Sequence, residues 1–171
     1  MSRLSATEPL DRTRHRVDSF RCGHEALDLW LRAHAGQSQR RDAARTFVTA
    51  EPDGAVVGYY TLVAAQVRHE TATGPVGRGM SGHYPIPVGL LARLAVDRRQ
   101  QGAGVGASLL LDALQRVTRA SDEIAVRAIV VDAIDESVAS FYRHFGFESS
   151  PLSPSALTVP LEIARRVLGS T

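Results

Sequence analysis

A glycine-rich turn in the middle of the chain has the residue types of a phosphate-binding site. The apolar segment Leu90–Val96 is followed, after five residues, by Gly102 and then by an amphipathic stretch. The full turn reads Gln101-Gly102-Ala103-Gly104-Val105-Gly106-Ala107. The first N–H groups of a helix have no partner inside it, and the positive end of the helix dipole adds to them, so a pyrophosphate can bind there. Glycine lets the backbone approach such a ligand without interference from a Cβ atom.

Two other interpretations of this turn are an ordinary glycine-rich turn and a dinucleotide-binding turn. Gly102-x-Gly104-x-x-Ala107 fits the dinucleotide pattern. That pattern normally follows its strand almost directly, whereas five residues separate Val96 from Gly102 here. A Walker phosphate loop is excluded because the sequence contains no lysine.

The second candidate is Tyr142, on a predicted helix that follows a buried strand. The segment from Asp135 to Phe147 reads Asp-Glu-Ser-Val-Ala-Ser-Phe-Tyr-Arg-His-Phe-Gly-Phe, and Gly146 is a typical helix end. An aromatic side chain on an amphipathic helix usually belongs to the core. This segment alone therefore does not show whether Tyr142 packs in the core or takes part in catalysis.

Taken together, the two segments resemble the GNAT acetyltransferase superfamily. The turn resembles the family motif Q/R-x-x-G-x-G/A at the family's distance from the fourth strand, and the tyrosine segment resembles N-x-x-A-x-x-F-Y-x-x-x-G-F. Asp135 stands where asparagine is common, and Val138 replaces alanine. The resemblance implies acetyl-CoA as co-substrate, with a cofactor site that begins at Gln101 and with the pyrophosphate on the N–H groups from Gly102 to Ala107.

The same resemblance implies roles for three backbone residues and for the tyrosine. The pantetheine arm of acetyl-CoA would pair with the backbone of Leu94, Ala95 and Val96. Tyr142 would be the general acid, because a phenol with a pKa near 10 can protonate the departing thiolate.

The N-terminal third resembles the opening of GNAT toxins from type II toxin–antitoxin pairs. Phe20-Arg21-Cys22-Gly23 and then Leu27-Asp28-x-Trp30-Leu31 follow the pattern F-x-C-G-x-x-x-L-D-x-W-L. The resemblance implies acetylation of the α-amino group of aminoacyl-tRNA, which blocks translation, a ribbon-helix-helix antitoxin and a homodimer. The alternatives are acetylation of a small amine or protein N-terminus, and a non-catalytic acetyl-CoA-binding module.

Arginine supplies all 20 basic residues, against 18 acidic ones. Its planar guanidinium suits phosphate recognition, although a GC-rich genome also explains the bias. Candidate tRNA contacts are Arg93, Arg40, Arg41 and Arg45. Arg93 is favoured because a buried strand rarely carries an unpaired charge.

The pattern of elements predicts an α+β fold. Helices are expected at His24–Ala44, Gly102–Ala120 and Glu136–Phe145, and strands at Thr46–Ala50, Ala55–Val67, Val88–Val96 and Val126–Ile134; a last strand and short helix follow over Leu157–Leu168. Thr71–Pro87, rich in glycine and proline, is a predicted surface loop. The resemblance implies one domain over residues 1–171, with a mostly antiparallel sheet of six to seven strands flanked by helices and a V-shaped cofactor cleft between strands 4 and 5.

Composition limits the remaining possibilities. With 44% hydrophobic and 22% charged residues, the chain has the composition of a soluble globular protein. No membrane-spanning run and no secretory signal are recognisable, so we expect a cytoplasmic protein. Cys22 is the only cysteine, which excludes an internal disulfide, and the six histidines have no metal-ligand spacing, so no metal is expected.

Overall fold

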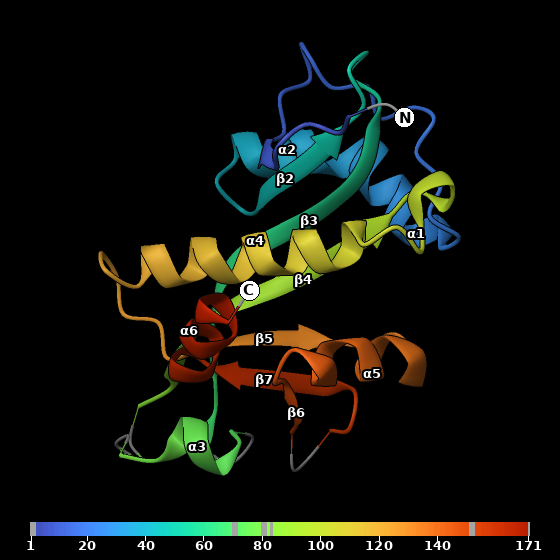
Figure 1. Ribbon diagram of the computed structural model, residues 1–171. Helices are drawn as coiled ribbons and strands as arrows, with labels where there is room; N and C mark the ends of the chain where they lie inside the picture. Colours follow the sequence, from blue (N-terminus) through green and yellow to red (C-terminus); the bar gives the residue numbers. More distant parts are fainter. Residues whose placement is uncertain (1–2, 70–71, 80–81, 83, 151–152, 171) are drawn as a thin grey trace. The chain divides into compact units, whose positions relative to one another are not determined.

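A sheet of antiparallel and parallel strands, with helices beside it, makes up the fold (Figure 1). The computed structural model describes residues 3–69, 72–79, 82, 84–150 and 153–170. The strands are β1 (Glu8–Pro9), β2 (Arg45–Ala50), β3 (Val56–Val67), β4 (Ile86–Val96), β5 (Ala128–Asp132), β6 (Glu148–Ser149) and β7 (Ala156–Pro160). The α-helices are α1 (Glu25–Leu29), α2 (Ala35–Arg40), α3 (Gly74–Gly77), α4 (Val105–Ala120), α5 (Glu136–His144) and α6 (Leu161–Gly169).

Hydrogen-bonded neighbours in the described sheet follow the order β1-β2-β3-β4-β5-β7-β6. β4 and β5 pair in parallel, and the pairs β1–β2, β2–β3, β5–β7 and β6–β7 are antiparallel. The predicted mixed, mostly antiparallel sheet flanked by helices is confirmed. The short strands β1 and β6 were not predicted, because two residues carry no alternating pattern.

The chain divides into two compact units. The first comprises Met1–Val63 and Ala92–Ala113, and the second comprises Ala64–Leu91 and Leu114–Thr171. The single domain over residues 1–171 therefore stays a prediction. So does the V-shaped cleft, because it would lie between strands of both units.

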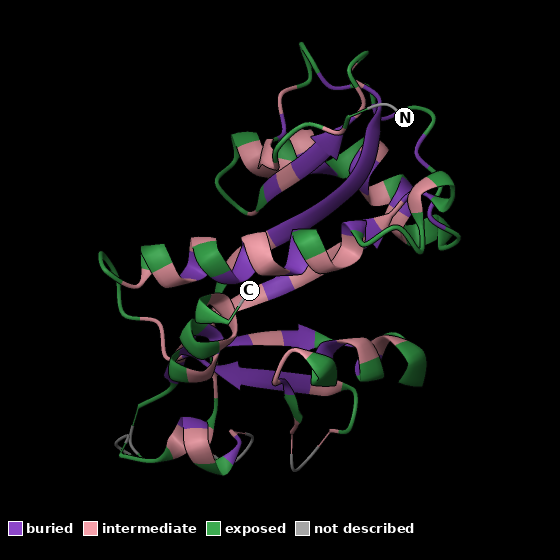
Figure 2. Ribbon diagram, viewed as in Figure 1, coloured by how far each residue is buried: buried purple, intermediate pink, exposed green. Residues whose placement is uncertain are grey.

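In the first unit, helices α1 and α2 and strands β2 and β3 enclose an apolar core. Val17, Phe20 and Leu31 are fully buried, together with Val48 and Tyr59. The Tyr59 hydroxyl donates to the carbonyl of Leu27 at 2.8 Å, which ties the strand to the helix. Figure 2 shows the resulting burial along β2 and β3.

The predicted helix over His24–Ala44 is interrupted and ends earlier than expected. A π-helical segment, Trp30–His34, lies between α1 and α2. The helix ends at Arg40, and Asp42 then adopts a φ of 56°, which is outside the right-handed helical region. π-Helical turns are uncommon and occur often at functional sites.

In the second unit, β5 lies between β4 and β7. Val88 pairs with Ala128, and Ala128 pairs with Pro160 on the other side. The predicted loop over Thr71–Pro87 contains the short helix α3, with proline in its first turn. The Arg127 guanidinium holds this helix by donating to the carbonyls of Val76 at 3.1 Å and Pro75 at 3.0 Å.

Candidate functional site

The glycine turn has the backbone conformation that a phosphate-binding turn needs. Gly102 and Gly104 have φ angles of 80° and 85°, a region that residues with a Cβ atom rarely adopt. A Cβ atom built on either glycine would have no atom within 4 Å. The turn is exposed from Gln101 to Gly104, and the space beside these two glycines is open. The turn precedes α4, which begins at Val105, three residues later than predicted.

The N–H groups of the turn are free to bind a ligand. Within the described residues, none of the six N–H groups from Gly102 to Ala107 donates a hydrogen bond; the first to do so is Ser108, to the carbonyl of Gly104 at 3.1 Å. Because α4 is 16 residues long, its dipole adds a positive field at this end. The donors and the field fit a pyrophosphate, which bears negative charge and accepts hydrogen bonds.

Leu94, Ala95 and Val96 are the last residues of β4. Ala95 is buried in the core of the first unit, whereas Leu94 and Val96 are half-buried. The pairs between β4 and β5 comprise Val88 to Leu91. The predicted pairing of Leu94–Val96 with a pantetheine arm stays a prediction.

Asp97 connects the end of β4 to the turn, and sequence reasoning missed it. Its side chain is 2% exposed and accepts hydrogen bonds from the backbone N–H groups of Arg21 and Arg99. Burial acts to raise the pKa of Asp97, but these bonds and the Arg99 guanidinium at 2.9 Å outweigh it and hold the pKa below its usual value. An acidic residue directly after a buried strand was the available signal.

A small hollow adjoins the glycine turn within the first unit. Its volume is about 290 Å³. Leu4, Ser5, Ala6, Thr7, Thr49, Ala103, Gly104, Val105, Ser108 and Leu109 line it. Residues 4–7 of the N-terminal arm (residues 3–11) therefore line the same hollow as the first turn of α4 and the residues that carry the free N–H groups.

Tyr142 lies in the second unit, on α5. The Asp135 side chain begins this helix by accepting a hydrogen bond from the Val138 N–H at 2.9 Å, so aspartate performs the cap at the position where the family motif has asparagine. The Tyr142 ring packs against Phe141 and Phe147, with centroids 5.2 and 5.4 Å away.

The Tyr142 hydroxyl is protonated and available. A phenol with its ordinary pKa near 10 carries its proton at neutral pH, and burial raises the pKa of Tyr142 further. Among the described residues, Thr73 Oγ1 is the one buried side-chain oxygen or nitrogen without a hydrogen-bond partner. The Tyr142 hydroxyl also has no hydrogen-bond partner among the described residues. Because it is not one of the buried oxygens without a partner, it is in contact with solvent.

Arg93 has an aromatic partner in place of an acidic one. Its guanidinium carbon lies 4.1 Å from the centroid of the Trp30 ring, and Trp30 stacks on Tyr59 with centroids 6.2 Å apart. Burial lowers the pKa of Arg93, while Tyr59 acts in the opposite direction. No carboxylate of the described residues pairs with Arg93, so this half-buried cation can still accept an anion.

The other predicted arginines lie around the end of α2. Arg40 and Arg41 are exposed. Arg45 is engaged, because it pairs with Asp42 at 2.6 Å and donates to the carbonyl of Gln39 at 3.1 Å. Arg40 and Arg41 are therefore better placed than Arg45 to meet a phosphate.

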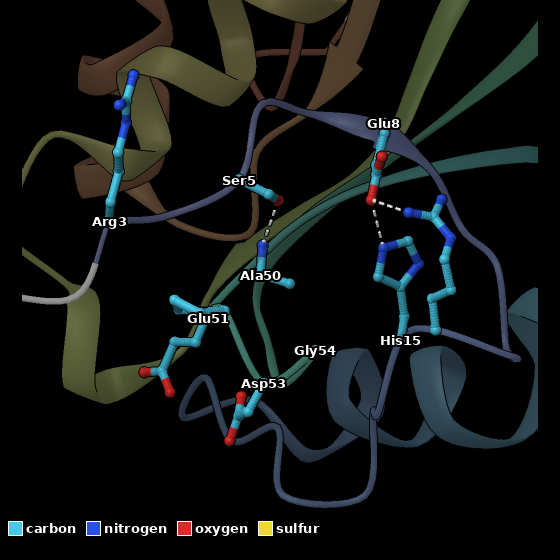
Figure 3. A pocket seen from close by; sticks show the side chains of 10 residues that line it. Arg3, Ser5, Glu8, His15, Ala50, Glu51, Asp53 and Gly54 are labelled. Carbon is cyan, nitrogen blue, oxygen red and sulfur yellow. Dashed lines mark hydrogen bonds and ion pairs between the residues drawn. The ribbon is translucent and has the colours of Figure 1, made fainter.

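A larger hollow, of about 470 Å³, contains none of the predicted site residues (Figure 3). In it, the buried His15 accepts the Asp11 N–H at Nδ1, at 2.9 Å, and its Nε2 lies 2.7 Å from Glu8. Nδ1 therefore carries no proton, and Nε2–H donates to Glu8. These bonds use both ring nitrogens to fasten the N-terminal arm, which makes His15 a structural residue.

The described residues contain no group of three or more His, Cys, Asp and Glu side chains arranged to hold a metal ion. Among the same residues, no helix has both the length and the apolar character required to cross a lipid bilayer.

Comparison with known proteins gives consistent matches. Residues 10–147 match the acetyltransferase (GNAT) family. A tRNA-acetylating toxin of Mycobacterium tuberculosis is 44% identical over 153 residues, which are 90% of each chain.

Two solved structures are similar over nearly the whole chain. The first is AtaT complexed with acetyl-methionyl-tRNAfMet, with a TM-score of 0.87, 28% identity and coverage of 96% of this chain and 99% of that one. The second is a mutant AtaT toxin bound to the C-terminus of the antitoxin AtaR and acetyl-CoA, with a TM-score of 0.81, 29% identity and coverage of 96% and 97%.

Proposed function

The chain belongs to the acetyltransferase (GNAT) family, and from this premise we propose that it acetylates the α-amino group of aminoacyl-tRNA as the toxin of a toxin–antitoxin pair. The observation that carries the proposal is the glycine turn: six free N–H groups stand at the start of a 16-residue helix, beside two glycines with positive φ. The tRNA-acetylating relative of 44% identity supports the acceptor.

The residues of the first unit bind and orient acetyl-CoA. The N–H groups from Gly102 to Ala107 hold the pyrophosphate, and the backbone of Leu94, Ala95 and Val96 pairs with the pantetheine arm. When bound, acetyl-CoA supplies the acetyl group as a reactive thioester. A backbone N–H near Val96 polarises the thioester carbonyl.

Tyr142 is the general acid. Its hydroxyl gives its proton to the departing sulfur, and a phenol still carries that proton at neutral pH. The ester carbonyl of an aminoacyl-tRNA withdraws electrons from the α-amine and lowers the pKa of that amine. Much of the amine is thus neutral at pH 7, and the reaction does not depend on a strong general base.

Arg93, Arg40 and Arg41 contact phosphates of the tRNA, whereas Arg45 has a lesser role because Asp42 pairs with it. Trp30 holds the Arg93 guanidinium in place and shields it from water. Replacing Arg93 with methionine is expected to raise the KM for charged tRNA while the KM for acetyl-CoA stays constant. Equal changes in both constants would contradict this role.

The proposed partner is an antitoxin of the ribbon-helix-helix class, and the proposed assembly is a homodimer in the cytoplasm. The AtaT structure with the C-terminus of AtaR supports an antitoxin of some kind. Co-expression with a candidate antitoxin of the ribbon-helix-helix class, followed by purification and light scattering, tests both the partner and the stoichiometry. A monomeric mass for the purified protein would refute the homodimer.

The acceptor is tested by incubating the protein with labelled acetyl-CoA and four acceptors: charged tRNA, uncharged tRNA, a polyamine and a peptide with a free N-terminus. Label on charged tRNA alone is expected. Label on the polyamine or the peptide, with none on charged tRNA, would assign the protein to another acetyltransferase class. Binding of acetyl-CoA without transfer to any acceptor would indicate a non-catalytic module.

A further inference from the structure

Three hydrogen bonds join the segment Asp97–Gln101, which leads into the glycine turn, to the loop Arg21–Gly23 from the N-terminal third of the chain. The Arg21 N–H donates to the Asp97 carboxylate at 3.0 Å, and the Arg98 N–H donates to the carbonyl of Arg21 at 2.8 Å. The Gln101 amide donates to the carbonyl of Cys22 at 2.8 Å. The residues before Gly102 are therefore fixed from outside their own segment.

Gln101 makes the most direct of these links. Besides the carbonyl of Cys22, its amide nitrogen donates to the carbonyl of Val96 at 2.9 Å. A side-chain amide has two N–H donors, and both are used here. Neither remains for a phosphate, so the side-chain amide nitrogen of Gln101 fixes the position of the turn instead of contacting the ligand.

The loop that receives this amide is itself anchored. The Cys22 N–H donates to the Asp28 carboxylate at 2.8 Å, and Asp28 is 5% exposed. Phe20, immediately before the loop, is fully buried against Tyr59, with ring centroids 5.5 Å apart. The backbone of Cys22 is thus fixed through its own N–H by a buried carboxylate, and the neighbouring Phe20 is fixed in the core, so the Cys22 carbonyl has a defined position.

We propose that Gln101 is a positioning residue, which couples the loop Arg21–Gly23 to the glycine turn and so sets the affinity for acetyl-CoA. This inference rests on the proposed function of the turn. A turn whose N–H groups already point at the ligand binds it without a further cost in ordering the backbone. The segment that resembles the opening of the GNAT toxins thereby influences the binding of acetyl-CoA.

Gln101→Met tests the proposal, because methionine has a similar length and no N–H donor. Gln100→Met is the matched control: Gln100 is the preceding residue, and its side chain makes no hydrogen bond within the described residues. Loss of two hydrogen bonds is expected to raise the Kd for CoA and the KM for acetyl-CoA about tenfold. The control is expected to stay within about twofold, and Gln101→Arg, which retains N–H donors, is expected to restore most of the affinity.

Kinetics distinguish a positioning role from a structural one. If Gln101 positions the turn, the KM for acetyl-CoA rises while kcat and the KM for the acceptor hold. A fall in kcat at constant KM, with a lower melting temperature, would mean that Gln101 only supports folding and would overturn the proposal. CoA affinity unchanged in Gln101→Met, or equally weak in Gln101→Met and Gln101→Arg, would also overturn it. Failure of the unaltered protein to bind CoA would instead refute the proposed function.

Discussion

Replacing Gly104 with alanine separates the cost of backbone strain from the loss of a ligand site. At a φ of 85°, an alanine costs about 1–2 kcal/mol in free energy of unfolding, because its Cβ crowds the backbone. No further steric cost is expected, since a Cβ atom at this position would meet no atom within 4 Å. For a chain of this size the melting temperature should fall by about 2–8 °C.

The effect on acetyl-CoA should be larger than the effect on stability. The added methyl group enters the open space beside the free N–H groups, where the pyrophosphate must approach. Losing one or two hydrogen bonds to a charged group corresponds to at least about a tenfold increase in Kd. Isothermal titration calorimetry with CoA measures this change, and differential scanning calorimetry measures the stability.

Gly79→Ala is the matched control. Gly79 has a φ of 76°, and a Cβ atom there would also meet nothing within 4 Å, so the strain is the same. It lies in the other unit, away from the glycine turn in sequence. The two variants should lose similar stability, and only Gly104→Ala should lose affinity. Equal CoA affinity in both variants would refute the assignment of the pyrophosphate to this turn.

Three further predictions concern single side chains. The folded pKa of Asp97 lies below its unfolded value, so its stabilisation is present above about pH 4 and is lost as the pH falls through the folded pKa. Asp97→Asn should therefore flatten the fall in melting temperature below about pH 4, and parallel curves would contradict this. Asp135→Ala removes the cap of α5 and should lower the free energy of unfolding, measured by urea denaturation, by about 1 kcal/mol. An unchanged urea midpoint would show that the cap does not stabilise the protein. Burial, and to a smaller extent the nearby Asp28, raises the pKa of the Cys22 thiol to about 11. Iodoacetamide at pH 7.5 should therefore modify Cys22 only after the protein unfolds. Rapid modification of the folded protein, detected by mass spectrometry, would contradict this.

Residue types and spacing were sufficient to predict the parts of the site that depend on local structure. Gly102 and Gly104 adopt the positive φ that glycine permits, and the segment after Asp135 forms the predicted helix with Tyr142 buried on it. The order of the main strands and helices followed from hydrophobic periodicity. These features depend on residues close together in the chain, which is why one sequence suffices.

Contacts between distant segments were not predictable in this way. Arg21 and Asp97 are 76 residues apart, and no local pattern links them. The position of Trp30 over Arg93 likewise depends on the helical segment that carries Trp30 and on the strand that carries Arg93. The π-helical turn at Trp30–His34 has the same apolar spacing in sequence as an ordinary helix, so periodicity alone predicts one unbroken helix.

The proposed acceptor and the role of Tyr142 are tested most directly by single-turnover acetyl transfer to charged tRNA, with the unaltered protein and Tyr142→Phe, and with CoA binding measured for both. Equal CoA affinity is expected, because the phenol does not contribute to the glycine turn. The unaltered protein should form acetyl-aminoacyl-tRNA, and the rate in the variant should be lower by about a hundredfold or more, the usual effect of losing a general acid. Equal rates would remove Tyr142 from the chemistry, and no product from the unaltered protein would contradict the assignment of aminoacyl-tRNA as the acceptor.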